Sequence, residues 1–152
     1  MQLYYPEAGF YFRVGMSASK SDMDAQFQEV SGIGVETDVM EYQEGGINDY
    51  SWKLPKAPRH DKLVLRKGLL SKKSDFRTWC KNNLVNNNMS NAIEPQQLWV
   101  TLLNPTGQPA MQWMFYNAYP VKWSLSSFDS MKNDILVESI ELVYTYFTET
   151  IY

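Results

Sequence analysis

The chain has 152 residues, a formal net charge of −3, one Cys and one His. This length fits a single domain, residues 1–152, with a core large enough to fold without disulfides. One Cys and one His exclude an internal disulfide and a zinc site of the Cys/His kind. No stretch approaches the roughly 20 apolar residues of a membrane-spanning helix, so we expect no stable membrane insertion of the monomer. Met1 to Glu7 lacks the features of a signal peptide, which favours synthesis in the cytoplasm.

The first predicted element is a half-buried strand near the N-terminus. Phe10, Phe12, Val14 and Met16 alternate with other residues, and this period of two places them on one face of a sheet. We assign Phe10 and Phe12 to the structural core. A polar loop, Ser17 to Asp24, follows this strand.

A strand, a glycine kink and a long hairpin are predicted between Phe27 and Pro55. Gly32 and Gly34 can adopt the positive φ of a sharp bend that other residues avoid. Strand-like runs from Val35 to Tyr42 and from Tyr50 to Leu54 flank a turn rich in Gly, Asn and Asp. The arm formed by these two runs is too polar to belong mostly to the core.

The segment after the hairpin leads back to buried structure. Pro55 to Asp61 contains two prolines, which remove backbone donors and fix φ, so this segment is not expected as an interior strand. Leu63 to Leu65 then begins a short buried strand that ends at Gly68.

One helix is predicted, from Ser71 to Asn88. Ser71 or Ser74 can cap its start, and a run of Asn residues ends it. Apolar residues recur at spacings of three and four and define one face, which we expect to be structural core packed against a sheet. This face comprises Phe76, Trp79, Cys80 and Leu84, with Val85 as a further candidate.

Three strands complete the predicted elements. Leu98 to Leu103 is apolar on both faces, which is typical of a central strand, and Asn104 to Pro109 has the composition of a turn. The return strand begins at Met111 and is bent or interrupted at Pro120, and a last strand covers Ile135 to Thr148. The residues of these strands assigned to the core are Leu102, Trp113, Phe115 and Leu142. Six or seven strands with few helices indicate a closed barrel or two packed sheets.

Charge is segregated along the chain. Asp22 to Asp49 carries eight acidic residues and no Lys or Arg, whereas Lys53 to Lys81 carries ten basic residues and two acidic ones. Two solvated faces that neutralise one another within a monomer would explain this pattern. Complementary surfaces on neighbouring subunits would also explain it, because a head-to-tail contact joins two different patches of one molecule. A nucleic-acid groove is disfavoured by the acidic composition and the lack of a binding motif.

Catalytic patterns are weak. His60 and Asp61 are adjacent, but neighbours in a strand or turn point apart, and no nucleophile motif accompanies them. Glu138 and Glu141 would lie on opposite faces of a strand, which disfavours shared acid/base work. The glycine pair Gly45-Gly46 lacks the Lys-Ser/Thr ending of a phosphate loop. We therefore expect a protein that is not an enzyme, with no catalytic, metal or cofactor site.

Several phrases of the sequence carry a family resemblance. They are FQEVSG, EYQEGG and KLP, followed in order by LVLRKGL, WVTLLN, WMFYNAYPVKW and ESIEL. Together they resemble the inner-tube proteins of contractile phage tails and contractile injection systems, the Hcp-like tail tube family. The resemblance covers nearly the whole chain. It does not distinguish a phage from a released injection system or a membrane-anchored secretion machine.

The resemblance implies a fold and an assembly. The implied fold is mainly β, a small barrel of two orthogonally packed antiparallel sheets with one flanking helix and an extended hairpin arm. The implied assembly is a homohexameric ring that stacks into a rigid tube, driven through a target envelope by a contracting sheath. The implied partners are sheath protein, baseplate or spike proteins, and cargo protein or DNA in the lumen. Such a particle is released by lysis or stays attached to the cell.

The resemblance also implies that the hairpin reaches neighbouring subunits or rings. The residues assigned to this subunit or ring interface are Glu41, Tyr42, Glu44, Gly45, Gly46, Asn48, Tyr50, Trp52, Lys53, Lys56 and Arg59. A paralogous ring at the junction of tube and spike is the alternative within the family. The alternative of a different class is a monomeric β-barrel that binds a small ligand in a pocket lined by Trp52, Trp79, Trp113 and Tyr116.

Overall fold

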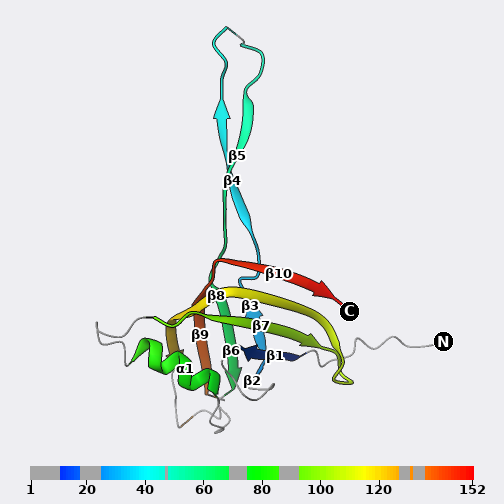
Figure 1. Cartoon of the computed structure of the whole chain (residues 1–152), viewed down its shortest axis with the longest axis vertical. Helices are drawn as coiled ribbons and strands as arrows, with labels where there is room; N and C mark the ends of the chain where they lie inside the picture. The colour runs from blue at the N-terminus through cyan, green and yellow to red at the C-terminus, as the bar shows by residue number, and fades with distance from the viewer. Residues whose placement is uncertain are drawn as a thin grey trace, which may run out of the picture.

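The computed structural model describes residues 11–17, 25–46, 48–68, 75–85, 93–126, 131 and 136–152. This part of the chain contains ten strands and one helix (Figure 1). The mainly β class with one helix and a protruding hairpin is therefore confirmed. Phe10 lies outside the described residues, as do the two Ser residues predicted to cap the helix. The elements are β1 (Tyr11–Met16), β2 (Ala25–Phe27), β3 (Glu29–Ser31), β4 (Glu36–Tyr42), β5 (Trp52–Arg59), β6 (Leu63–Gly68), α1 (Asp75–Leu84), β7 (Gln96–Leu103), β8 (Pro109–Leu125), β9 (Val137–Val143) and β10 (Tyr146–Ile151).

Eight antiparallel strands form the main sheet, in the order β2-β1-β7-β8-β9-β6-β3 with β10 beside β8. The path does not close, because β2 and β3 at its two ends do not pair with each other. They are instead consecutive in the chain and are joined at Gln28, whose amide donates to the carbonyl of Arg66 over 2.9 Å. The expectation of a closed barrel is therefore wrong. The end strands β2 and β3 are connected through the backbone at Gln28, but no hydrogen-bonded ladder joins them. A second sheet contains β4 and β5 alone.

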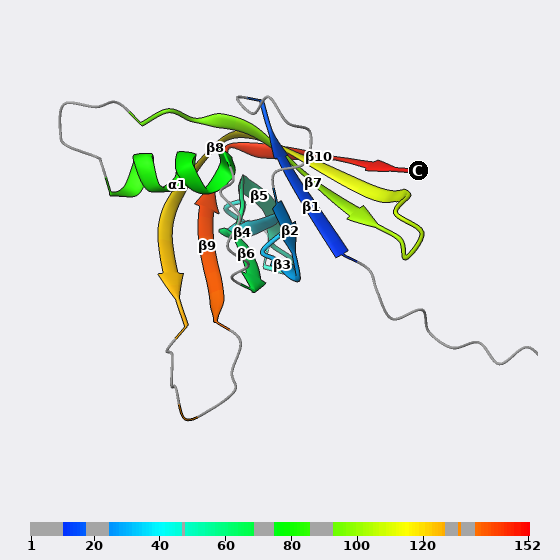
Figure 2. The same cartoon turned by 90° about the horizontal axis from the view of Figure 1, so that it is seen from below.

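The long strand β8 connects two parts of the main sheet. Its first part pairs with β7 and β10, whereas Tyr119–Leu125 pairs with β9. Between these parts Asn117 has a φ of 54°, a left-handed conformation that Asn tolerates better than most residues. The register then shifts between Pro120 and Lys122. The predicted interruption at Pro120 is thus a local irregularity in a strand that continues and curves, as Figure 2 shows.

The last predicted strand is divided in two. β9 and β10 are separated at Tyr144 and Thr145, opposite the left-handed Asn117 of β8. The Thr145 amide donates to the carbonyl of Tyr116 over 2.9 Å, and Asn117 Nδ2 donates to Thr145 Oγ1 over 3.4 Å. Both neighbouring strands therefore change direction at the same place.

The hydrophobic core lies between α1 and the main sheet. Phe76 of α1 meets Phe27 of β2 edge to face, with ring centroids 5.7 Å apart. Trp79 Nε1 donates to the carbonyl of Glu94 over 3.0 Å, so the buried indole is satisfied. Leu84 is partly buried and Val85 is 70% exposed, and the apolar face is shorter than predicted. Among the described residues, no helix has the length and apolar character needed to cross a membrane.

The residues assigned to the core differ in burial. Phe12 and Trp113 are partly buried and pack against the core cluster. Leu102 is only partly buried, whereas its neighbour Leu103 is buried. The register between β7 and β8 shifts between these two leucines, and a register irregularity changes which side chain turns inward. Those that are buried are Phe76, Trp79, Phe115 and Leu142.

A buried charge cluster fastens α1 to the sheet. Glu138 of β9 is fully buried, and its Oε1 accepts a hydrogen bond from Trp123 Nε1 over 2.6 Å. The same oxygen lies 3.3 Å from Arg77 Nε of α1, and Oε2 lies 3.9 Å from Lys67 Nζ of β6. Burial and the nearby Glu138 carboxylate raise the pKa of the Cys80 thiol, which Lys67 lowers to a smaller extent. A buried charge requires such partners, so three elements depend on this carboxylate.

We expect Glu138→Gln to lower the free energy of unfolding by about 2–4 kcal/mol, because it removes the carboxylate that balances two nearby cations. Urea denaturation measures this change. Glu141→Gln on the same strand is the control, since its carboxylate is partly exposed and lies 4.0 Å from Lys62; we expect a change below about 0.5 kcal/mol. Equal effects of the two variants would contradict a special contribution from the buried cluster.

The chain enters the arm through Gly32. This glycine has a φ of 85°, and a Cβ added to it would collide with the carbonyl oxygen of Lys62. The Tyr144 hydroxyl donates to the Gly32 carbonyl over 3.4 Å. Gly34 is different, because it has no positive φ and no atom within 4 Å of an added Cβ. Only the first of the two predicted kink glycines therefore requires its residue type.

We expect Gly32→Ala to destabilise the protein by about 2–4 kcal/mol, because both its φ and the Lys62 backbone oppose a side chain. Gly34→Ala is the matched control two residues away, with an expected change within about 0.5 kcal/mol. Thermal and urea unfolding of the two variants measure the difference. Similar stability of the two variants would show that the Gly32 geometry is not required.

Candidate assembly interface

The arm of β4 and β5 projects from the body of the molecule (Figure 1). Every residue of both strands is exposed. The return strand continues past the predicted end at Leu54, through Pro55 and Pro58 to Arg59. Among the described strands β5 pairs with β4 alone, so the prediction that the two prolines do not lie in an interior strand is confirmed, and one edge of β5 remains open. An isolated two-stranded hairpin is marginally stable in water, so such an arm gains from a partner.

One face of the arm is apolar. Met40 pairs with Leu54, and Tyr42 pairs with Trp52; residues two apart along a strand share a face. Their exposed fractions are 49% for Met40, 45% for Leu54, 53% for Tyr42 and 51% for Trp52. Tyr50 adds a ring whose centroid lies 5.8 Å from that of Trp52, at 82°. A contiguous exposed apolar surface of this kind is typical of interaction sites.

The opposite face is mixed in character. Glu41 pairs with Lys53 and Val39 with Pro55 across the two strands. Val39 is 54% exposed, which gives each face at least one apolar residue in solvent. The two faces therefore differ in apolar content. The first face presents four large apolar side chains in two cross-strand pairs, whereas the opposite face presents one apolar pair and one charged pair.

The base of the arm is held by local contacts. Arg59 lies 3.3 Å from Glu36 and 3.2 Å from Asp38. His60 Nδ1 lies 3.2 Å from the Gly34 carbonyl, and the His60 ring packs on Tyr144 with centroids 5.2 Å apart. His60 therefore occupies a structural position at the root of the hairpin. No group of three or more His, Cys, Asp or Glu among the described residues could hold a metal ion.

The acidic and basic blocks meet partly within one chain. The two ion pairs of Arg59 join them at the base of the arm, and a third pair joins Arg66 to Glu29 over 3.5 Å. These acidic and basic residues therefore neutralise one another within one chain. Within the described part of the chain, no ion pair involves Glu41, Glu44 or Asp49. The acidic charge near the tip is left for solvent or for another molecule.

All residues assigned to the interface lie on the arm. Glu44, Gly45, Gly46 and Asn48 belong to the turn, where Gly46 has a φ of 100°. Arg59 lies at the base, away from the tip. Val39, Met40 and Leu54 are further exposed apolar residues of the arm that the sequence assignment did not include, although the alternation of apolar residues along both strands indicates them. The residues assigned to the interface are thus all exposed, and the interface itself stays a prediction.

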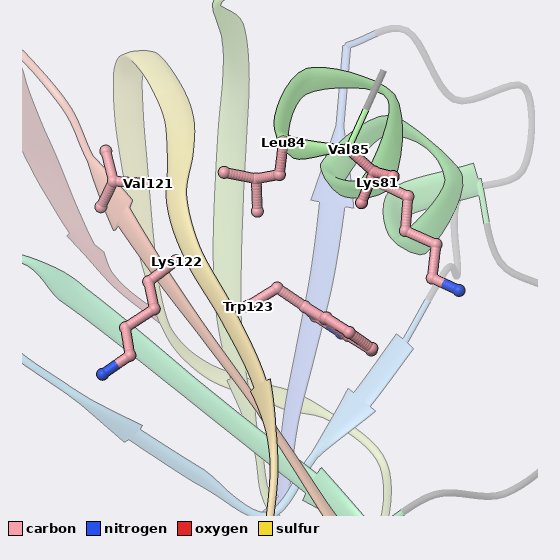
Figure 3. A pocket seen from close by; sticks show the side chains of 6 residues that line it. All are labelled: Lys81, Leu84, Val85, Val121, Lys122 and Trp123. Carbon is pink, nitrogen blue, oxygen red and sulfur yellow. The ribbon is translucent and has the colours of Figure 1, made fainter. Parts of the chain in front are cut away.

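A second surface feature is an open groove of about 310 Å³ between α1 and β8, shown in Figure 3. Trp52, Trp79, Trp113 and Tyr116, the predicted ligand-pocket residues, do not line it. They lie apart: on the arm, on α1, and on β8. In the described part of the chain, the four residues named for the small-ligand alternative therefore do not line this groove and are spread over three elements. The lining residues of the groove are Lys81, Leu84, Val85, Val121, Lys122 and Trp123.

Solved structures provide the comparisons for this architecture. A chain of the sheath-tube complex of the extracellular contractile injection system PVC, in its extended state, is 28% identical, with a TM-score of 0.75 over 99% of this chain and 95% of that one. A chain of the six-fold symmetrised baseplate of the anti-feeding prophage is 23% identical, with a TM-score of 0.75 over 99% and 97%. Hcp1 from Flavobacterium johnsoniae shares the fold at 14% identity, with a TM-score of 0.52 over 92% and 94%.

The comparison with protein families agrees with the likeness in structure. A search of curated protein sequences found no significant match. The family model described as T4-like virus tail tube protein gp19 matches residues 8–148. This match runs from before β1 into the first half of β10 with the arm included, and it confirms the resemblance seen in the sequence. The chain therefore belongs to the T4-like virus tail tube protein gp19 family.

Proposed function

We propose that this protein is the repeating subunit of the rigid inner tube of a contractile injection system or phage tail. The observation that carries the proposal is the arm, a two-stranded ribbon that is exposed throughout and apolar on one face. An exposed apolar surface is typical of an interaction site, and a subunit that repeats can bury it against the next copy. Family membership supports the same function, since the family consists of structural tube proteins.

The proposed assembly is a homohexameric ring that stacks into a tube. The six-fold symmetrised baseplate structure, which contains a chain of this fold, supports six copies in a ring. One edge of β10 pairs with β8, and no described strand pairs with the other edge. An open strand edge is a template for pairing with a neighbouring copy. Sheets that continue from subunit to subunit would give the ring its stiffness and line its lumen.

The proposed mechanism is mechanical and needs no catalytic group or cofactor. Contraction of a surrounding sheath drives the tube through a target envelope, and the lumen then conducts protein or DNA. The sheath-tube structure of PVC supports a sheath as the outer partner, and the baseplate and cap structures of the anti-feeding prophage support partners at the two ends. The subunit is made in the cytoplasm and becomes part of a phage or injection particle.

Trp52→Ser is expected to raise the protein concentration needed for assembly at least about tenfold, because an aromatic anchor in an interface is worth about 2 kcal/mol or more. Size-exclusion chromatography with light scattering over a dilution series measures this concentration. Val39→Ser is the matched control, since Val39 is equally exposed but lies on the opposite face of the same ribbon. Assembly of Trp52→Ser at the wild-type concentration would contradict a role for the apolar face.

Charge reversal near the tip is expected to weaken assembly as well. We propose that Glu41 and Glu44 meet basic residues of a neighbouring subunit, and Glu41→Lys with Glu44→Lys would turn this attraction into repulsion. The variant should assemble less readily at low salt, and added salt should reduce its difference from the wild type. Glu94→Lys, an exposed reversal outside the arm, is the control. Unchanged assembly and unchanged salt dependence would refute the electrostatic contact.

A further inference from the structure

We propose that the tip of the arm docks into the groove between α1 and β8 of a copy in the next ring. This inference deepens the proposed tube function and rests on it. The groove supplies two Lys side chains and an apolar lining, and the tip supplies two carboxylates and two aromatic rings. Among the described residues, neither the two Lys side chains of the groove nor the two carboxylates of the tip form an ion pair.

The position of the two surfaces favours contact between copies. Figure 1 shows the arm and α1 at opposite ends of the longest axis of the molecule. The arm points away from the body, so its tip cannot reach the groove of its own chain. Two different patches at opposite ends of one molecule form a heterologous, head-to-tail contact, and repetition of this contact gives a stack. The contact therefore belongs between successive rings.

The groove combines cationic and apolar groups. Val85 is 70% exposed and Val121 is 38% exposed, so both offer surface for burial. Lys81 Nζ lies 5.3 Å from the centre of the Trp123 ring, a cation–π contact that positions the ammonium at the groove. In Figure 3 the side chains of Lys81 on α1 and Lys122 on β8 point away from each other, on opposite sides of Trp123. Neither lysine forms an ion pair with any residue in the described part of the chain.

The tip has the complementary chemistry. Glu44 and Asp49 are exposed on the two sides of the turn, and neither is paired with a described cation. Tyr50 is 54% exposed and Trp52 is 51% exposed, and their edge-to-face contact prearranges them. Preorganised aromatic side chains make effective anchors because little conformational entropy is lost when they bind. In the docked arrangement an aromatic ring of the tip is buried in the groove, and the two carboxylates of the tip form ion pairs with the two Lys ammonium groups.

A two-component stacking experiment tests this docking directly. The tip variant carries Glu44→Lys with Asp49→Lys, and the groove variant carries Lys81→Glu with Lys122→Glu. Each variant alone repels its own copies at the proposed contact. In an equal mixture, rings of the two variants can alternate, because every tip then meets a groove of opposite charge. Lys62→Glu, which reverses a basic residue outside the groove, is the control.

We expect each charge-reversal variant to form rings but to need at least tenfold more protein than the wild type to stack. The equal mixture should stack within about threefold of the wild-type concentration, as should the control, by electron microscopy and sedimentation. Rings formed by each variant alone verify that it folds. Stacking of either variant alone at the wild-type concentration, or a mixture that does not stack, would overturn the docking contact and leave the tube function standing. Wild-type protein that forms no rings would contradict the tube function itself.

Discussion

The structure depends on one strand that must serve two ladders. β8 has 17 residues and forms the shared border between the β1-β7 side of the sheet and the β9-β6 side. It does so by changing direction at the left-handed Asn117, where the neighbouring chain also changes direction at Thr145. This paired bend turns the sheet around the core side chains and leaves room for α1 on the same side. The helix is then fixed by the buried Glu138 carboxylate, which touches groups from β6, α1 and β8.

The arm differs from the body in how it is stabilised. At its base, Arg59 bridges two carboxylates and His60 packs on an aromatic ring of the body. Further out every residue of the two strands is exposed, and the large apolar side chains of the ribbon are about half exposed. Burial against a second molecule would release this surface from water and stabilise the ribbon at the same time. In the proposed tube, assembly would therefore also stabilise the fold of the arm.

Much of the fold follows from short-range patterns. The alternation of apolar residues along β1 and β7 and their 3.6-residue period along α1 identify these elements and the face that each one buries. Gly and Asn between two strand-like runs identify the hairpin. The same patterns place the residues assigned to the interface on an exposed hairpin, and their role in assembly stays a prediction. These signals depend only on residues that are close together in the sequence, so one sequence is enough to detect them.

Other features depend on partners that are distant in the sequence. The separation of β2 from β3 at Gln28 reflects pairing with β1 on one side and β6 on the other, and the separation of β9 from β10 reflects the bend of β8. Whether Leu102 or Leu103 turns inward depends on a register shift. Burial of Glu138 needs cations from two other elements, and the groove combines residues about 40 positions apart. No pattern within one segment contains this information.

The most direct test of the tube function is negative-stain electron microscopy of the purified wild-type protein at high concentration, at low and at moderate salt. The function predicts six-fold rings and stacks of rings, with fewer stacks as salt screens the charged contacts. Dispersed monomers at every concentration and salt condition would contradict it.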